Sequence, residues 1–85
     1  MNNKMLKGLV EAGAVKAVSI IANGAIIHAE ILTLNGDKKV ITTQAGANKT
    51  WSTIDSAAKW LKKLGLGNMK LDVGKWSPNQ RGLVL

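Results

Sequence analysis

The sequence predicts a small α+β domain: a short helix, a three-stranded antiparallel sheet, a second helix packed on that sheet and a short last strand. Two observations carry this prediction. Three apolar runs of strand length are joined by Asn23-Gly24 and Asn35-Gly36, and an amphipathic segment with helix start and stop signals follows them. Asn-Gly strongly indicates a tight hairpin, because both central residues of a type I′ turn adopt positive φ. Two such pairs in succession therefore predict an antiparallel meander.

The first predicted element is a short helix that Asn2 or Asn3 can cap and that Gly13 ends. One side of this helix is apolar and consists of Met5, Leu6, Leu9 and Val10. Gly8 in its middle costs about 1 kcal/mol relative to alanine. We therefore expect this helix to depend on packing against the rest of the domain.

The three strands are expected over residues 15–22, 25–34 and 37–43. Two-residue turns would pair Ile20 with Ile27 and Ile31 with Val40. One face of the sheet then collects the side chains that we predict for the core, namely Val18, Ile20, Ala22, Ile27, Ala29, Ile31 and Val40.

The opposite face of the predicted sheet is of mixed character. It carries Val15, Ala17, Ser19, Ile21, Ile26, His28, Glu30, Leu32, Leu34, Lys39, Ile41 and Thr43. A half-buried antiparallel sheet usually alternates apolar and polar residues, so the large aliphatic side chains here imply that a helix, a second subunit or a ligand covers part of this face. We favour a homodimer, with the predicted interface residues Ile21, Ile26, His28, Leu32, Leu34 and Ile41.

The second helix has the clearest signals in the chain. Ser52 and Asp55 form a capping box in its aspartate form, and Gly65 followed by Leu66 predicts a Schellman stop. Between them runs an apolar stripe at helical spacing, made of Ile54, Ala57, Ala58, Leu61 and Leu64. Lys59, Lys62 and Lys63 fall on the far side, so the helix should present a lysine face to solvent.

A short last strand is expected over residues 69–73, and its partner is left open. Residues 75–81 are turn-rich and basic, and residues 82–85 are apolar again. We interpret 1–85 as a single domain in which 75–85 form a tail that docks on the body or completes a partner's sheet.

Catalytic and metal-binding motifs are not indicated. The chain has 85 residues and no cysteine, so disulfides and thiolate metal sites are excluded. In the expected register His28 lies across from Ser19 and Thr43, with Glu30 on the same face, but a flat strand supplies no oxyanion site for such a triad. We expect His28 to make a cross-strand or interface contact, and we predict no enzyme activity, no cofactor and no metal.

Charge gives the strongest functional indication. Twelve lysine and arginine residues against five acids leave a net charge of +7, which favours a polyanionic partner, although the same lysines would also serve solubility. Only one cation is arginine, the usual reader of guanine edges, so we expect contacts to the backbone or shape of a nucleic acid. Tryptophans beside lysines suggest base stacking, with packing as the alternative role. The candidate nucleic-acid-binding residues are Lys49, Trp51, Lys59, Lys62, Lys63, Lys70, Lys75, Trp76 and Arg81.

Two resemblances bear on these residues. The order of helix, meander and lysine-bearing helix is similar in layout to double-stranded-RNA-binding domains, whose lysines lie at the start of the second helix; Lys49 and the Ser56-Ala57-Ala58-Lys59 run are loosely similar to that pattern. Separately, the block from Lys49 to Gly65 resembles small uncharacterised proteins carried on bacterial plasmids and genomic islands. This second resemblance implies mobile-element biology and favours DNA over RNA.

The sequence thus predicts a non-enzymatic nucleic-acid-binding protein. The alternative is a small protein-interaction module, an adaptor or an inhibitor, that uses the mixed sheet face. The apolar segment 17–34 contains Asn23-Gly24, His28 and Glu30, so we interpret it as a hairpin and not as a membrane span. We expect a soluble, cytoplasmic protein.

Overall fold

In the computed structural model of the chain, residues 1–76 are described, and they form the predicted α+β fold. The elements are α1 (Asn3–Glu11), β1 (Val15–Gly24), β2 (Ile26–Thr33), β3 (Lys38–Val40), α2 (Ile54–Lys63) and β4 (Lys70–Trp76). Four strands make one sheet in the order β3-β2-β1-β4. The order of elements along the chain is the predicted one.

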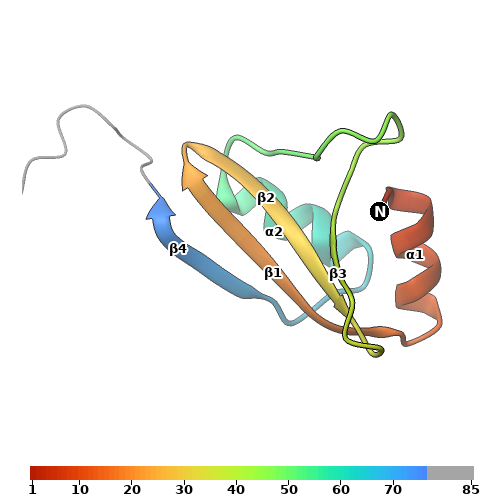
Figure 1. The fold of residues 1–85 in the computed structure, drawn as a ribbon. Coiled ribbons are helices and arrows are strands. Elements are labelled where there is room, and N and C mark those ends of the chain that lie inside the picture. The colour runs from red at the N-terminus through yellow and green to blue at the C-terminus, as the bar shows by residue number, and fades with distance from the viewer. Residues whose placement is uncertain (77–85) are drawn as a thin grey trace, which may run out of the picture.

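The core lies between the sheet and the two helices. α2 packs across β1 and β2 on one face of the sheet, while α1 lies beside β3 at the other end of the molecule (Figure 1). The fully buried aliphatic side chains include Leu6 from α1 and Leu61 from α2. The predicted core face is confirmed for six of its residues, Val18, Ile20, Ala22, Ile27, Ala29 and Ile31.

The first hairpin turn differs from the predicted type I′ turn. Asn23 pairs with Ile26, so the two-residue loop is Gly24-Ala25. Gly24 has a φ of 64°, and among residues 1–76 only glycines have a positive φ, which is the pattern of a type II′ turn with glycine first. The register is therefore displaced by two residues: Ile20 lies opposite Ala29 and not opposite Ile27. Because side chains alternate with a period of two, the composition of each face is unchanged.

In the second hairpin the register is displaced by one residue from the predicted one. This displacement reverses which side chains of β3 face the core. The Thr33 amide donates to the Asp37 carbonyl (2.9 Å), which closes a three-residue loop whose last residue, Gly36, has a φ of 91°. A glycine in this conformation at the end of such a loop is typical of a G1 bulge. Val40 consequently lies opposite Glu30 on the outer face.

Ile41, predicted as an interface residue on the mixed face, is instead in the core. Its amide donates to the Ala29 carbonyl (2.9 Å), and its side chain is fully buried. Val40, predicted for the core, is only half-buried. The one-residue displacement explains both corrections.

The helix boundaries follow local capping chemistry. Thr53, and not Ser52, is the N-cap of α2, because its Oγ1 accepts a hydrogen bond from the Ser56 amide (3.1 Å). The predicted Schellman stop is confirmed: the Gly65 amide donates to the Lys62 carbonyl and the Leu66 amide to the Leu61 carbonyl. For α1, Asn2 is the cap, and its Oδ1 accepts from the Met5 amide.

The last strand, β4, has two features that the sequence left open. It pairs in parallel with β1, and it lies at the edge of the sheet. It also extends to Trp76, so Lys75 and Trp76 belong to a strand and not to a turn-rich tail (Figure 1). Its register against β1 shifts between Ile21 and Asn23, where β4 carries an extra residue in a bulge. Arg81 and the rest of the predicted tail lie outside the described residues.

No helix within residues 1–76 is both long enough and apolar enough to span a membrane.

Candidate functional site

The positive charge lies on the surface with little internal compensation. All eleven lysines fall within the described residues, and none is buried. Within residues 1–76, Lys59 is the lysine that forms an ion pair with a side-chain carboxylate. The exposed lysines without a carboxylate partner are therefore available to a partner or to solvent.

The lysine face of α2 is present as predicted. Ala57 and Leu61 are buried against the sheet, while Lys59, Lys62 and Lys63 are exposed. Lys59 Nζ lies 3.0 Å from Asp55 Oδ2, one helical turn away, and both side chains are 73% exposed. A pair this exposed contributes only about 0.3–0.5 kcal/mol, so an external phosphate can compete for Lys59.

Lys49 occupies a different environment from the other lysines. Its Nζ lies 5.5 Å from the centre of the Trp51 ring and 5.1 Å from that of Trp60. The two rings pack on one another with centres 5.5 Å apart and planes inclined at 60°. All three side chains are half-buried. Lys49 is thus held in a cation–π contact with two aromatic faces.

The same cluster explains the position of Trp51. Its amide donates to the Ile27 carbonyl (2.9 Å) and its carbonyl accepts from the Ile27 amide (3.3 Å). Trp51 therefore pairs with β2 on the same side as β3, past the point where β3 ends. Its ring packs against the core. These contacts favour the packing role for Trp51 over base stacking.

Three candidate residues lie on β4. Lys70 pairs with Ser19, Lys75 with Asn23 and Trp76 with Gly24. All three are exposed, and Trp76 is the most accessible of the tryptophans. Lys70 and Lys75 border hollows on the sheet face opposite the helices, whereas Trp76 borders a hollow with Ser52, Thr53 and Ile54 at the start of α2. The structure therefore divides these β4 candidates between the two faces of the sheet. Arg81 is outside the described residues.

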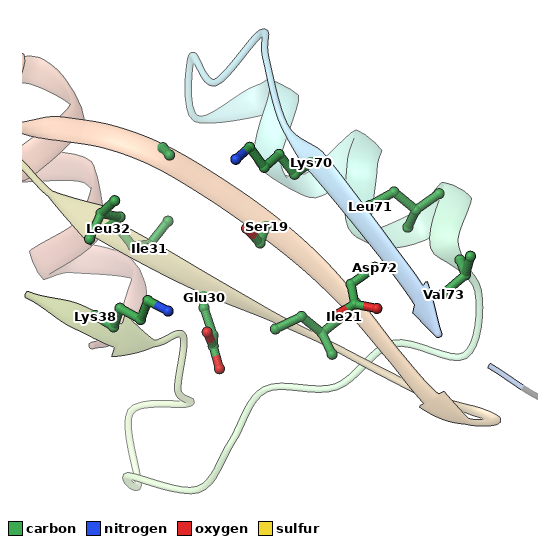
Figure 2. A pocket seen from close by; sticks show the side chains of 11 residues that line it. Ser19, Ile21, Glu30, Ile31, Leu32, Lys38, Lys70, Leu71, Asp72 and Val73 are labelled. Atoms are coloured by element: carbon green, nitrogen blue, oxygen red, sulfur yellow. The ribbon is translucent and has the colours of Figure 1, made fainter. Parts of the chain in front are cut away.

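The face of the sheet opposite the helices is uncovered within residues 1–76. We call it the open sheet face; its central residues are Ala17, Ser19, Ile21, His28, Glu30 and Leu32, all half-buried. A shallow depression of about 530 Å³ lies on this face. Figure 2 shows Lys38 on β3 and Lys70 and Asp72 on β4 among the side chains that line it. Cations, carboxylates and aliphatic side chains are mixed on this face.

The predicted interface residues are distributed unevenly over the molecule. Ile21, His28 and Leu32 lie on the open sheet face, and Ile26 is exposed at its end beside the first turn. Leu34 is exposed in the second turn, where it borders a hollow beside α1. Ile41 is buried in the core, as described above.

His28 has different cross-strand neighbours from those expected. Ser19 pairs with Glu30 and His28 pairs with Ile21, so the expected alignment of Ser19 with His28 is wrong because of the two-residue displacement. His28 Nε2 lies 4.0 Å from Glu30 Oε1. Within residues 1–76 no three side chains of histidine, aspartate or glutamate come together as metal ligands.

Two features escaped the sequence analysis. Met1 adds to the outer side of the β3 segment: its amino group donates to the Val40 carbonyl (3.0 Å), and its carbonyl accepts from the Thr42 amide (2.7 Å). The second feature is the exposure of Leu71 and Val73, which depends on where β4 pairs. Nothing in the local pattern indicates either feature.

Searches of protein-family models, curated proteins and solved structures give no match to this chain.

Proposed function

We propose that the protein binds nucleic acid through phosphate contacts from the lysine face of α2. The observation that carries the proposal is the uncompensated surface charge: of eleven lysines, only Lys59 has a carboxylate partner among residues 1–76, and that partner is exposed. Binding a polyanion releases its condensed counterions, and this release favours association with a surface of free lysines.

The α2 lysine face suits backbone recognition better than base reading. Lys62 and Lys63 occupy the last turn of a helix whose opposite side is anchored by Ala57 and Leu61. Lysine ammonium groups act as point charges without the fixed fork geometry of arginine. The expected mode is therefore weakly sequence-dependent, with DNA favoured by the resemblance of residues 49–65 to plasmid-borne proteins.

Trp76 is the candidate for stacking on an exposed base. It is 41% exposed, whereas Trp51 and Trp60 pack on each other and on Lys49. A preference for single strands would therefore depend on Trp76, and it should fall when Trp76 is replaced by leucine.

The experiment is fluorescence anisotropy with labelled single-stranded and duplex DNA and RNA at about 50 and about 200 mM salt. A variant with Lys59, Lys62 and Lys63 replaced by glutamine should bind more weakly, with the salt slope flattened by about one unit per lost phosphate contact. The matched control replaces Lys4, Lys7 and Lys16, three exposed lysines elsewhere, and removes the same net charge.

Two results would count against the proposal. Absence of binding by the unaltered protein at low salt rejects nucleic acid as the partner. Equal weakening by the two triple variants removes the α2 face from the binding mode and leaves only diffuse attraction by net charge.

The second candidate function is a protein-interaction module that uses the open sheet face. It is favoured by the mixture of aliphatic, acidic and basic side chains around the depression in Figure 2. Ile26→Glu or Leu32→Glu should abolish capture of a protein partner and leave nucleic-acid affinity nearly unchanged, since both residues are remote from the α2 lysines.

A further inference from the structure

The sheet has two lateral edges, and the described residues protect them unequally. On the β3 side, Met1 hydrogen bonds to Val40 and Thr42, and Trp51 pairs with Ile27 where β3 no longer covers β2. On the other side, β4 is the outermost strand, and no described segment pairs with its outer edge. An unpaired strand edge is a template for pairing with another chain.

The side chains of β4 leave this edge exposed and partly apolar. All seven are exposed, including Leu71 (51%), Val73 (42%) and Trp76 (41%). Figure 2 shows Lys70 and Asp72 over the open sheet face, whereas Leu71 and Val73 point away from it. Natural edge strands are commonly protected by charged side chains, proline, a bulge or a covering segment. β4 carries Lys70 and Lys75 and a bulge after Asp72, but residues 70–72 are regular and contain no proline.

The charges of this regular stretch are self-complementary. Lys70 and Asp72 flank Leu71 on the same face of the sheet, because they pair with Ser19 and Ile21 of β1. In an antiparallel pair of two identical strands centred on Leu71, each Lys70 lies directly opposite Asp72 of the other copy. Asp72 Oδ1 accepts from the Gly74 amide (3.0 Å), so its second oxygen can accept from lysine.

We propose that a second copy of this chain docks antiparallel along β4, with Leu71 on the twofold axis. The contact joins two sheets edge to edge, pairs the exposed backbone groups, brings the two Leu71 side chains together and forms two Lys70 to Asp72 ion pairs. A twofold contact requires a self-complementary patch, and a foreign peptide would have no reason to match the Lys70, Leu71, Asp72 order. The domain is also small enough to gain from association.

This dimer does not depend on nucleic-acid binding, because it uses β4, whereas the proposed phosphate contacts come from α2. Self-association is measured with the protein alone, and phosphate contacts are measured by the salt dependence of nucleic-acid affinity. The two proposals can therefore fail separately.

The test is sedimentation equilibrium of the purified protein with charge-reversal variants. Lys70→Asp and Asp72→Lys should each weaken the dimer by about tenfold or more, because two ion pairs become like-charge contacts. The double variant, Lys70→Asp with Asp72→Lys, restores opposite charges in the Leu71-centred register and should recover most of the affinity. No other register of the regular stretch predicts this recovery.

A cysteine placed at the axis gives a second readout. The chain has no cysteine, and opposed residues of antiparallel strands lie within disulfide range. Leu71→Cys should therefore oxidise rapidly to a covalent dimer. Met5→Cys, on α1 and at least as exposed (59% against 51%), should not.

Three outcomes would overturn the proposal. The first is a protein that stays monomeric at all concentrations tested. The second is a dimer that persists in both single charge-reversal variants. The third is a dimer that Ile21→Glu abolishes and Leu71→Lys does not. Circular dichroism of each variant shows whether the fold is preserved, and the recovery by the double variant excludes simple misfolding.

Discussion

At the scale of single residues, Lys49 shows how a side chain of predicted function acquires a structural role. Sequence alone places it beside Trp51 and in a basic unit with α2. The fold sets its ammonium group over both Trp51 and Trp60, at 5.5 and 5.1 Å from the ring centres. A half-buried contact of this kind contributes about 1 kcal/mol, so moving Lys49 to a phosphate would forfeit that stabilisation.

Replacement of Lys49 by glutamine should lower the free energy of unfolding by about 1 kcal/mol, while arginine, which also binds aromatic faces, should retain most of it. Urea denaturation followed by circular dichroism measures the difference. Lys7→Gln, at an exposed helical position with similar propensity, is the control and should be nearly neutral. A loss of DNA affinity for Lys49→Gln without any loss of stability would assign Lys49 to phosphate binding instead.

At the scale of elements, the exact position of a helix end or a turn depends on which of two adjacent residues takes the capping or turn position. Ser52 and Thr53 both suit an N-cap by type, yet Thr53 accepts from the Ser56 amide and its Oγ1 lies 2.8 Å from Ser56 Oγ. In the first turn, the glycine of Asn23-Gly24 begins the loop and the asparagine stays in β1. The residue types therefore predicted that a cap and a turn occur here. Which of two neighbouring residues takes each position was decided by the backbone geometry of the fold.

The cap assignment has a measurable consequence. Thr53→Ala should destabilise the protein by about 1 kcal/mol, because the Ser56 amide loses its acceptor. Ser52→Ala should change the free energy of unfolding by no more than about 0.5 kcal/mol, since the side chain is exposed. Thermal or urea unfolding compares the two variants directly, and the reverse order of effects would reinstate the capping box at Ser52.

At the scale of the whole molecule, the one-residue displacement in the second hairpin decides which side chain completes the core. Val40 and Ile41 are adjacent and both β-branched. Because successive strand residues point to opposite faces, only one of the two can face the core. The three-residue loop ending at Gly36 directs Ile41 inward, where it is fully buried with Leu6, Ile31 and Leu61.

Truncation of these neighbours tests that arrangement. Ile41→Ala should cost about 2–5 kcal/mol, the usual loss for a buried isoleucine, and Val40→Ala should cost much less because Val40 is half-buried. Should Ile41→Ala fail to fold, Ile41→Val should still show a loss of about 1 kcal/mol. Comparable losses at the two positions would contradict the observed register.

The sequence by itself determined the order of the elements, the apolar faces of β1, β2 and α2, and the lysine face that α2 presents to solvent. These follow from periodicity and capping, which act over a few residues, and the alternation of β1 and β2 survives a two-residue displacement unchanged. The tertiary structure alone decided the faces of β3, the position of β4 and the contacts of Lys49. The faces of β3 depend on the geometry of the loop before it, because a one-residue change in loop length reverses a strand. The pairing of β4 with β1 joins residues separated by both hairpins and α2, and Lys49 meets Trp60 only because α2 packs on the sheet. The lysine face was therefore predictable, and the place of β4 as the outermost strand of the described sheet was not.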